Sequence, residues 1–207
     1  MSKTVIGCAL LVGLLLLLAV IVGVTSVGVY NGLVGQEQAV EAQWAQVENV
    51  YQRRADLVPN LVATVRGAAE FERQTLNDVV AARARVGQLQ VTPEVLNDPA
   101  AFRQFEQAQD ALSGALSRLL VTVERYPQLQ AVPAFRDLMV QLEGTENRIA
   151  VERRRFNEVA RDYNTAVRRV PAAWFIQLLG WDFEPKVYFE SRPGAEEVPE
   201  VEFDFEE

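Results

Sequence analysis

Pairs of carboxylates are the groups in this sequence whose type and spacing come nearest to acid–base chemistry. Glu70 and Glu72 lie two residues apart, and Glu143 and Glu146 lie three apart. Two carboxylates can divide the acid and base roles in glycoside cleavage. Carboxylates this close along a long helix more often belong to solvated faces or ion pairs, and the sequence supplies no substrate cleft. We therefore expect a protein that is not an enzyme.

Histidine is absent from the sequence, and there is one cysteine, Cys8. This composition excludes serine and cysteine hydrolases with a histidine base, zinc sites of the HExxH type and histidine-containing di-iron sites. A lone cysteine also excludes an intrachain disulfide and a metal site with several cysteines. The net charge of −8 argues against a nucleic-acid partner. We expect no cofactor.

A second set of polar residues occupies helix positions that should be apolar. Arg54 and Glu72 interrupt an apolar series, and Glu146 to Arg148 interrupt the middle of another. Because unpaired buried charges are strongly destabilising, we predict a buried polar network that fixes helix register. Its candidate members are Arg54, Asp56, Asn60, Arg66, Glu72, Glu146, Asn147 and Arg148. The alternative is a site for a hard cation, with oxygen ligands from Asp56, Asn60, Glu143 and Glu146.

Apolar residues recur every seven positions along most of the chain, which predicts long helices. Two series run in parallel between residues 37 and 89, beginning at Val40 and Trp44, and another runs from Phe135 to Val170. This period is typical of helices that supercoil around their neighbours, as in a coiled coil. We predict helices over residues 37–89 with a kink at Pro59, over 94–126 and over 133–170. Together they would form an antiparallel bundle over residues 37–171.

The first part of the chain is predicted to cross a membrane. Residues 5–29 contain no charge, and 19 of these 25 residues are hydrophobic. As a helix they would span roughly 37 Å, enough for a hydrocarbon core of about 30 Å. This length favours an uncleaved signal anchor over a cleaved signal peptide, whose apolar region is shorter. The lipid bilayer is therefore an expected partner.

Charges on either side of the span predict its orientation. Lys3 lies in the N-terminal segment 1–4, whereas the first charges after the span are Glu37 and Glu41. By the positive-inside rule we expect a single-pass inner-membrane protein with a cytoplasmic N-terminus and an extracytoplasmic, periplasmic bundle. Residues 30–36 form the juncture. There, Gly28 and Gly32 either let two helices approach closely or make the connection flexible.

Beyond the bundle the chain is first aromatic and then acidic. Residues 172–183 predict a short helix that either covers the end of the bundle or meets a neighbouring subunit or the membrane surface. Residues 184–207 carry a charge of −7 and end in alternating apolar and acidic residues. They predict either a strand that adds to another sheet or a solvated tail. The candidate interaction residues are Trp174, Phe175, Trp181, Phe183, Val201, Phe203 and Phe205.

Several segments of the chain resemble the LemA family of membrane proteins. They are Tyr30–Val34, Arg54–Val62, Leu142–Ala150, Arg154–Asn157 and Tyr163–Asn164, and the resemblance extends from Tyr30 to the end of the chain. It implies an all-α fold with a single N-terminal transmembrane helix, an antiparallel bundle of long helices and a short extended tail. It implies no activity, because members of the family are not known as enzymes.

Two functional hypotheses follow from these features. The first is a membrane-anchored scaffold that forms homo-oligomers through its helices, aromatic patch and tail, and organises a bacterial cell envelope. The second is an adaptor or sensor whose exported bundle binds and regulates a membrane protein partner, such as a protease. The acidic tail and the exposed aromatic residues would then be the docking surfaces.

Overall fold

The computed structural model of the chain describes residues 3–67, 72–89 and 92–190, and every regular element within these ranges is a helix. Six α-helices, α1 to α6, and one 3-10 turn, η1, follow one another along the chain. They are α1 (Lys3–Arg66), α2 (Arg73–Gln88), η1 (Pro93–Asn97), α3 (Pro99–Val123), α4 (Pro127–Gln130), α5 (Pro133–Arg168) and α6 (Ala172–Leu179). The predicted all-α class is confirmed.

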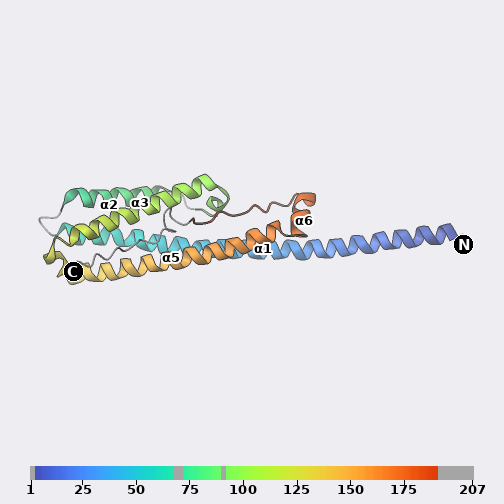
Figure 1. Cartoon of the computed structure of the whole chain (residues 1–207), viewed down its shortest axis with the longest axis horizontal. Coiled ribbons are helices and arrows are strands. Elements are labelled where there is room, and N and C mark those ends of the chain that lie inside the picture. Colours follow the sequence, from blue (N-terminus) through green and yellow to red (C-terminus); the bar gives the residue numbers. More distant parts are fainter. Residues whose placement is uncertain (1–2, 68–71, 90–91, 191–207) are drawn as a thin grey trace, which may run out of the picture.

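Helix α1 is the axis around which the other helices are arranged (Figure 1). It has 64 residues, so it is about 96 Å long at about 1.5 Å per residue. Helix α5 packs along its C-terminal half in the opposite direction, and α2 and α3 form a second antiparallel pair beside them. The N-terminal half of α1 projects alone beyond the bundle. The predicted antiparallel bundle on one N-terminal apolar helix is confirmed.

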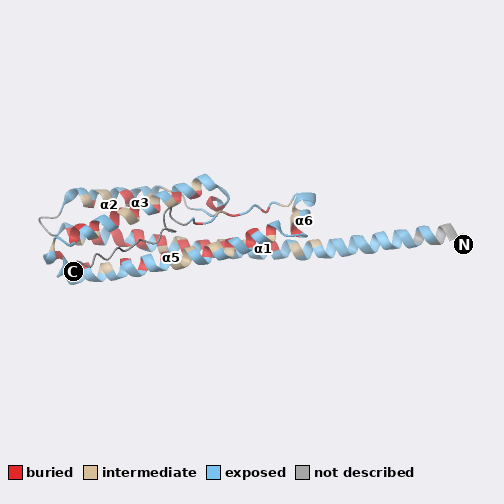
Figure 2. Ribbon diagram, in the orientation of Figure 1, coloured by how far each residue is buried: buried red, intermediate tan, exposed pale blue. Residues whose placement is uncertain are grey.

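The seven-residue apolar series form the core, which runs the length of the bundle (Figure 2). It consists of two hydrophobic clusters. The one nearer the N-terminal half of α1 is aromatic and contains Trp44, Phe102, Phe105, Phe156 and Phe189. The other is aliphatic and contains Val58, Leu61, Leu112, Leu119 and Leu142. The switch between the two clusters falls at Arg54, the largest charged side chain that the bundle buries.

The predicted juncture at residues 30–36 is not a separate connection. Helix α1 passes through it without a break, and Leu33 is buried in the aromatic core cluster. The reason is that the apolar stripe of the bundle begins before Glu37, so packing keeps these residues helical despite Gly32 and Gly35. The apolar segment predicted to cross a membrane and the central helix of the bundle are therefore one continuous helix.

The helix predicted over residues 37–89 is in fact two helices, and Pro59 does not separate them. Helix α1 continues through Pro59 to Arg66, and the chain folds back so that α2 begins at Arg73. Proline leaves the carbonyl of Ala55 without its intrahelical donor. Nε of Arg83 on α2 donates to this oxygen at 3.0 Å. The hydrogen bond compensates the proline and ties α2 to α1.

The second predicted helix also begins later than expected. Residues 93–97 form η1, and α3 starts after Asp98, whose side chain accepts hydrogen bonds from the backbone N–H groups of Ala100 and Ala101 at 2.8 and 3.2 Å. An aspartate in this position satisfies amides that no helical carbonyl can reach, and Pro99 supplies a preset first residue. The start of α3 is thus encoded locally.

Candidate functional site

A buried arginine joins three helices in the middle of the bundle. Arg54 on α1 is only 1% exposed. Its Nη1 donates to Oγ of Ser113 on α3 at 2.6 Å and to Oε1 of Glu146 on α5 at 2.8 Å. Its Nη2 donates to the side-chain oxygen of Gln109 and to the backbone oxygen of the same residue at 3.2 Å. We call these four residues the Arg54 cluster.

The Arg54 cluster neutralises its cation without fully burying both charges. Glu146 remains 45% exposed at the side chain, so water still solvates part of the carboxylate. The guanidinium also lies 5.1 Å from the centre of the Tyr51 ring, which favours a cation. The Nε atom of Arg54 is buried and has no partner among the described residues. Such a geometry fixes the relative register of α1, α3 and α5, because a slip of any helix breaks charged hydrogen bonds.

Of the eight residues predicted to form a polar network, the structure brings only Arg54 and Glu146 together. Glu72 lies just before α2 and pairs with Arg125 at 3.3 Å on the surface. The side chain of Asp56 accepts from Gln52 at 2.8 Å. The remaining four, Asn60, Arg66, Asn147 and Arg148, are exposed. These differences follow from the break in the predicted helix and from the outward face of α5 on which the last two lie.

Gln109 and Ser113 were not among the predicted members of the polar network. A signal for Gln109 existed, because it interrupts the seven-residue series of Phe102, Leu116 and Val123. Ser113 had none. The alternative cation site is not assembled either, since the described residues contain no group of three or more His, Cys, Asp or Glu side chains that could hold a metal.

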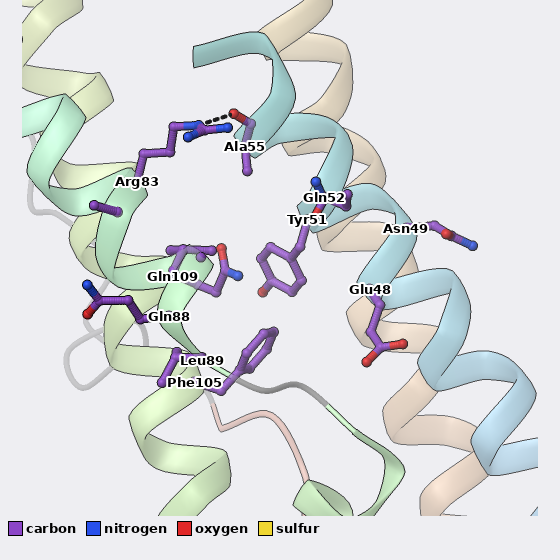
Figure 3. A pocket seen from close by; sticks show the side chains of 13 residues that line it. Glu48, Asn49, Tyr51, Gln52, Ala55, Arg83, Gln88, Leu89, Phe105 and Gln109 are labelled. Carbon is purple, nitrogen blue, oxygen red and sulfur yellow. Dashed lines mark hydrogen bonds between the residues drawn. The ribbon is translucent and has the colours of Figure 1, made fainter. Parts of the chain in front are cut away.

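A cavity of about 630 Å³ opens beside the Arg54 cluster, between α1, α2 and α3 (Figure 3). Tyr51 and Phe105 form its apolar part, with their ring centres 5.2 Å apart and nearly perpendicular. Its polar lining comes from Glu48, Asn49, Gln52, Arg83, Gln88 and Gln109. This combination of aromatic, amide and charged groups is suited to a ligand or a peptide segment that is itself amphipathic.

Partial burial changes the acid–base properties of this cavity. Desolvation raises the pKa of Glu48 above its usual 4.5, although a hydrogen bond from Nε1 of Trp44 at 3.0 Å opposes the shift. Burial also raises the pKa of the Tyr51 hydroxyl. Both groups therefore hold their protons more tightly than they would in water.

An extended segment packs along the bundle after α6. Residues 181–190, which we call the strap, contain no helix and run beside α1 and α5. The side-chain amide of Asn164 donates to the oxygen of Lys186 at 2.7 Å and accepts from its N–H at 2.7 Å. Asn157 does the same for Phe189, at 2.8 and 2.9 Å. Two asparagines on α5 thus replace the strand partner that an extended chain requires.

The side chains of the strap anchor it in the bundle. Nζ of Lys186 is buried and donates to Glu37 at 2.7 Å and to Asn97 at 2.9 Å. The ring of Phe189 packs against Trp44, Phe102 and Phe156 in the aromatic core cluster. Residues 184–190 are therefore part of the folded body and not part of a solvated tail. The sequence offered a signal in the seven-residue spacing of Asn157 and Asn164.

The predicted aromatic interaction residues divide between the core and the surface. Phe183 is buried and packs edge-on against Tyr30 at 5.5 Å, and Trp181 contacts the same ring at 5.1 Å. Phe175 is half-buried against Trp181. Trp174 is the one of these four that is largely exposed. The other three predicted residues, Val201, Phe203 and Phe205, lie outside the described residues.

Sequence comparisons find a family model and several relatives that match this chain. The family model of the LemA family matches residues 43–203. The magnetosome protein MamQ of Magnetospirillum gryphiswaldense is 27% identical over 183 residues, which cover 81% of this chain and 66% of MamQ. The magnetosome proteins MamQ 1 and MamQ 2 of Paramagnetospirillum magneticum are 26% identical over the same coverage. This chain thus spans slightly less than two thirds of the length of these relatives. The match over most of the bundle shows that the chain belongs to the LemA family.

Proposed function

We propose that this protein is a non-enzymatic, membrane-anchored scaffold that self-associates and organises the cell envelope or its membrane. The observation that carries the proposal is the continuity of α1. One helix is long and apolar enough to cross a membrane in its N-terminal part and forms the centre of the bundle in its C-terminal part. The bundle is thus joined to the predicted membrane span without a hinge, as a structural support requires.

An open helix face near the membrane supports the self-association. Gly28, Gly32 and Gly35 share one side of α1, and a Cβ built on any of them would meet nothing within 4 Å. Small residues at this spacing let two membrane helices approach closely and exchange dispersion contacts. We propose that a second copy of the chain packs on this face.

The location and orientation belong to the same proposal. The charge pattern around the span favours an inner-membrane protein with residues 1–4 in the cytoplasm and the bundle in the periplasm. The relatives are named as magnetosome proteins, which is consistent with a role in shaping or organising a membrane system. The bundle would then serve as the spacer between neighbouring copies.

Crosslinking at the native cysteine tests the self-association. Cys8 is exposed on α1, so a bis-maleimide in membranes should join neighbouring chains, and light scattering in detergent should give the mass of more than one chain. Gly28→Leu should lower both signals because it fills the open face. Gly23→Leu is the matched control, since it adds the same side chain in the same span on another face. A monomer by both measurements would overturn the proposal.

The cavity in Figure 3 favours a second candidate function, in which the bundle is an adaptor for a membrane protein partner. Its volume of about 630 Å³ and mixed lining suit a peptide segment of such a partner. Ala84→Tyr would fill the opening from its α2 side. If co-purification of a partner is lost while crosslinking at Cys8 persists, the adaptor function holds. If the partner set is unchanged, the cavity does not serve as its docking site.

A further inference from the structure

Helix α6 exposes more apolar surface than a water-soluble bundle needs. Leu178 is 79% exposed and Trp174 is 65% exposed. They lie four residues apart on the face of α6 opposite Ala172 and Ile176, which pack on the bundle. The twelve residues from Val170 to Trp181 contain no charge, and Gln177 is their single polar side chain. The remaining exposed aliphatic residues of the bundle are scattered, whereas these form one patch.

The position of this patch is fixed relative to the membrane helix. Trp181, directly after α6, packs on Tyr30 of α1 at 5.1 Å, and Phe175 of α6 packs on Trp181 at 5.7 Å. Tyr30 is the first residue after the charge-free span 5–29. Ala172, at the start of α6, borders a second cavity together with Gly32 and Leu33 of α1. These contacts hold α6 at the level where α1 leaves the hydrocarbon core.

The orientation of α6 also suits a membrane surface. Figure 1 shows α6 turned across the axis of α1, at the end of the bundle that faces the projecting half of that helix. A short helix that lies across a membrane-spanning helix runs along the plane of the bilayer. Figure 2 shows the outer side of α6 exposed. Gly180, in the left-handed conformation with φ of +66°, ends α6 and turns the chain back into the strap.

We infer that α6 lies in the interfacial layer of the same bilayer that α1 crosses, with Trp174 and Leu178 among the lipid chains. Tryptophan favours this layer because its ring is apolar while its N–H still reaches water. Arg168 and Arg169, both exposed, lie at the C-terminal end of α5, two residues before α6, and would be available to contact lipid phosphates. The occupant is lipid because the exposed apolar surface of α1 continues from Tyr30 through Trp181 to Phe175 of α6. The inference requires the membrane anchoring of this protein but not its self-association.

Two contacts with one bilayer have a mechanical consequence. A single helix leaves a bundle free to rotate about the helix axis and to tilt in any direction. Insertion of α6 at one side of α1 fixes both the rotation and the height of the bundle above the membrane. The strap begins at Trp181 and connects α6 to the aromatic core cluster, in which its residues Phe183 and Phe189 are buried.

Spin labels on the full chain in vesicles test the inference. A nitroxide would be attached to Leu178→Cys in a Cys8→Ala background, and the protein would be reconstituted into vesicles of phosphatidylethanolamine and phosphatidylglycerol. The matched control is Val140→Cys, which replaces an aliphatic residue that is 70% exposed near the opposite end of α5. Both positions are exposed, so neither label disturbs the core, and thermal unfolding by circular dichroism verifies the fold.

Power saturation with oxygen and with a water-soluble nickel chelate measures the depth of each label. We expect the label at position 178 to be more accessible to oxygen than to the nickel chelate, and the label at position 140 to show the reverse. Equal nickel accessibility at both positions would overturn the inference, because α6 would then lie in water. Dipolar broadening at position 178 would also overturn it, because the patch would then contact a second copy of the chain.

Discussion

Removing the buried cation of the Arg54 cluster should destabilise the bundle far more than removing the arginine next to it. Arg54 is 1% exposed and donates to groups on α3 and α5. Arg54→Ala would remove the hydrogen bonds that Gln109 and Ser113 accept from the guanidinium, and it would open a void between the two core clusters. Each buried polar group left without a partner costs about 1–3 kcal/mol, and the void adds to this cost. Arg53→Ala, at an exposed neighbour, should change the free energy of unfolding by at most about 0.5 kcal/mol.

Glu146→Ala should also destabilise the bundle, because it leaves the guanidinium of Arg54, which is 1% exposed, without its counter-charge. The lost charged hydrogen bond contributes about 1.5–3 kcal/mol, and water entering at the place of the 45% exposed carboxylate would offset part of the remaining cost. The double variant Arg54→Ala/Glu146→Ala should cost clearly less than the sum of the two single variants, because each removes the same ion pair.

Chemical unfolding in mild detergent, followed by far-ultraviolet circular dichroism, measures these differences. The helical signal is large because α1, α3 and α5 all contribute to it. If Arg54→Ala cost no more than Arg53→Ala, or if the double variant were additive, then Arg54, Ser113, Gln109 and Glu146 would not act as one unit. The Arg54 cluster would then not fix the register of α1, α3 and α5.

Three further predictions concern the strap, the proline and the cavity. Asn164→Leu removes both hydrogen bonds to the strap and should lower the free energy of unfolding by about 1–3 kcal/mol in the same assay, whereas Asn147→Leu on the exposed face should be near neutral. Arg83→Ala leaves the carbonyl freed by Pro59 without its donor and should cost about 1–3 kcal/mol, with the exposed Arg85→Ala as control. Burial raises the pKa of Glu48, so its folded form binds the proton more tightly and stability should increase as pH falls through the folded pKa, which lies above 4.5. Glu48→Gln should therefore raise the melting temperature at neutral pH and lose this advantage below pH 4.5, and an unchanged pH profile would contradict the assignment.

The seven-residue period predicted which residues are buried better than where helices end. Val40, Trp44, Val58 and Leu142 all occupy the core as their spacing required. The same period hid the turn between α1 and α2, because both helices turn their apolar stripes toward one core and the series continues across the turn in phase. Pro59 predicted a kink within one helix, whereas α1 passes through Pro59 and ends at Arg66. Its local cost is offset by Arg83, a residue 24 positions later, which no local rule could have paired with it.

The polar contacts show the same limit of sequence reasoning. A charge on an apolar stripe pointed to Arg54, since burial of the residues around it made a partner necessary. The identity of the partners depends on how α3 and α5 are rotated about their axes, and several polar residues near Glu146 would have served equally well. The strap was not predicted as one unit. Its first residues, 181–183, include two aromatic residues and fall in the short helix predicted over 172–183, which in fact ends at Leu179, whereas residues 184–190 fall in the predicted acidic tail. The binding of the strap depends on the side-chain amides of Asn157 and Asn164, which offer a backbone-like partner without forming a sheet.

Because α1 is unbroken, any tilt of its proposed membrane-spanning part is also a tilt of the whole bundle. From Tyr30 to the end of α1 at Arg66 the helix extends about 55 Å beyond the membrane-spanning segment. Membrane helices tilt by about 20° on average, and they tilt more in thinner bilayers. A change from upright to a tilt of about 20° would move the C-terminal end of α1 sideways by about 19 Å. This displacement is larger than the diameter of one helix. Local bilayer thickness would thus affect where the distant end of the bundle lies.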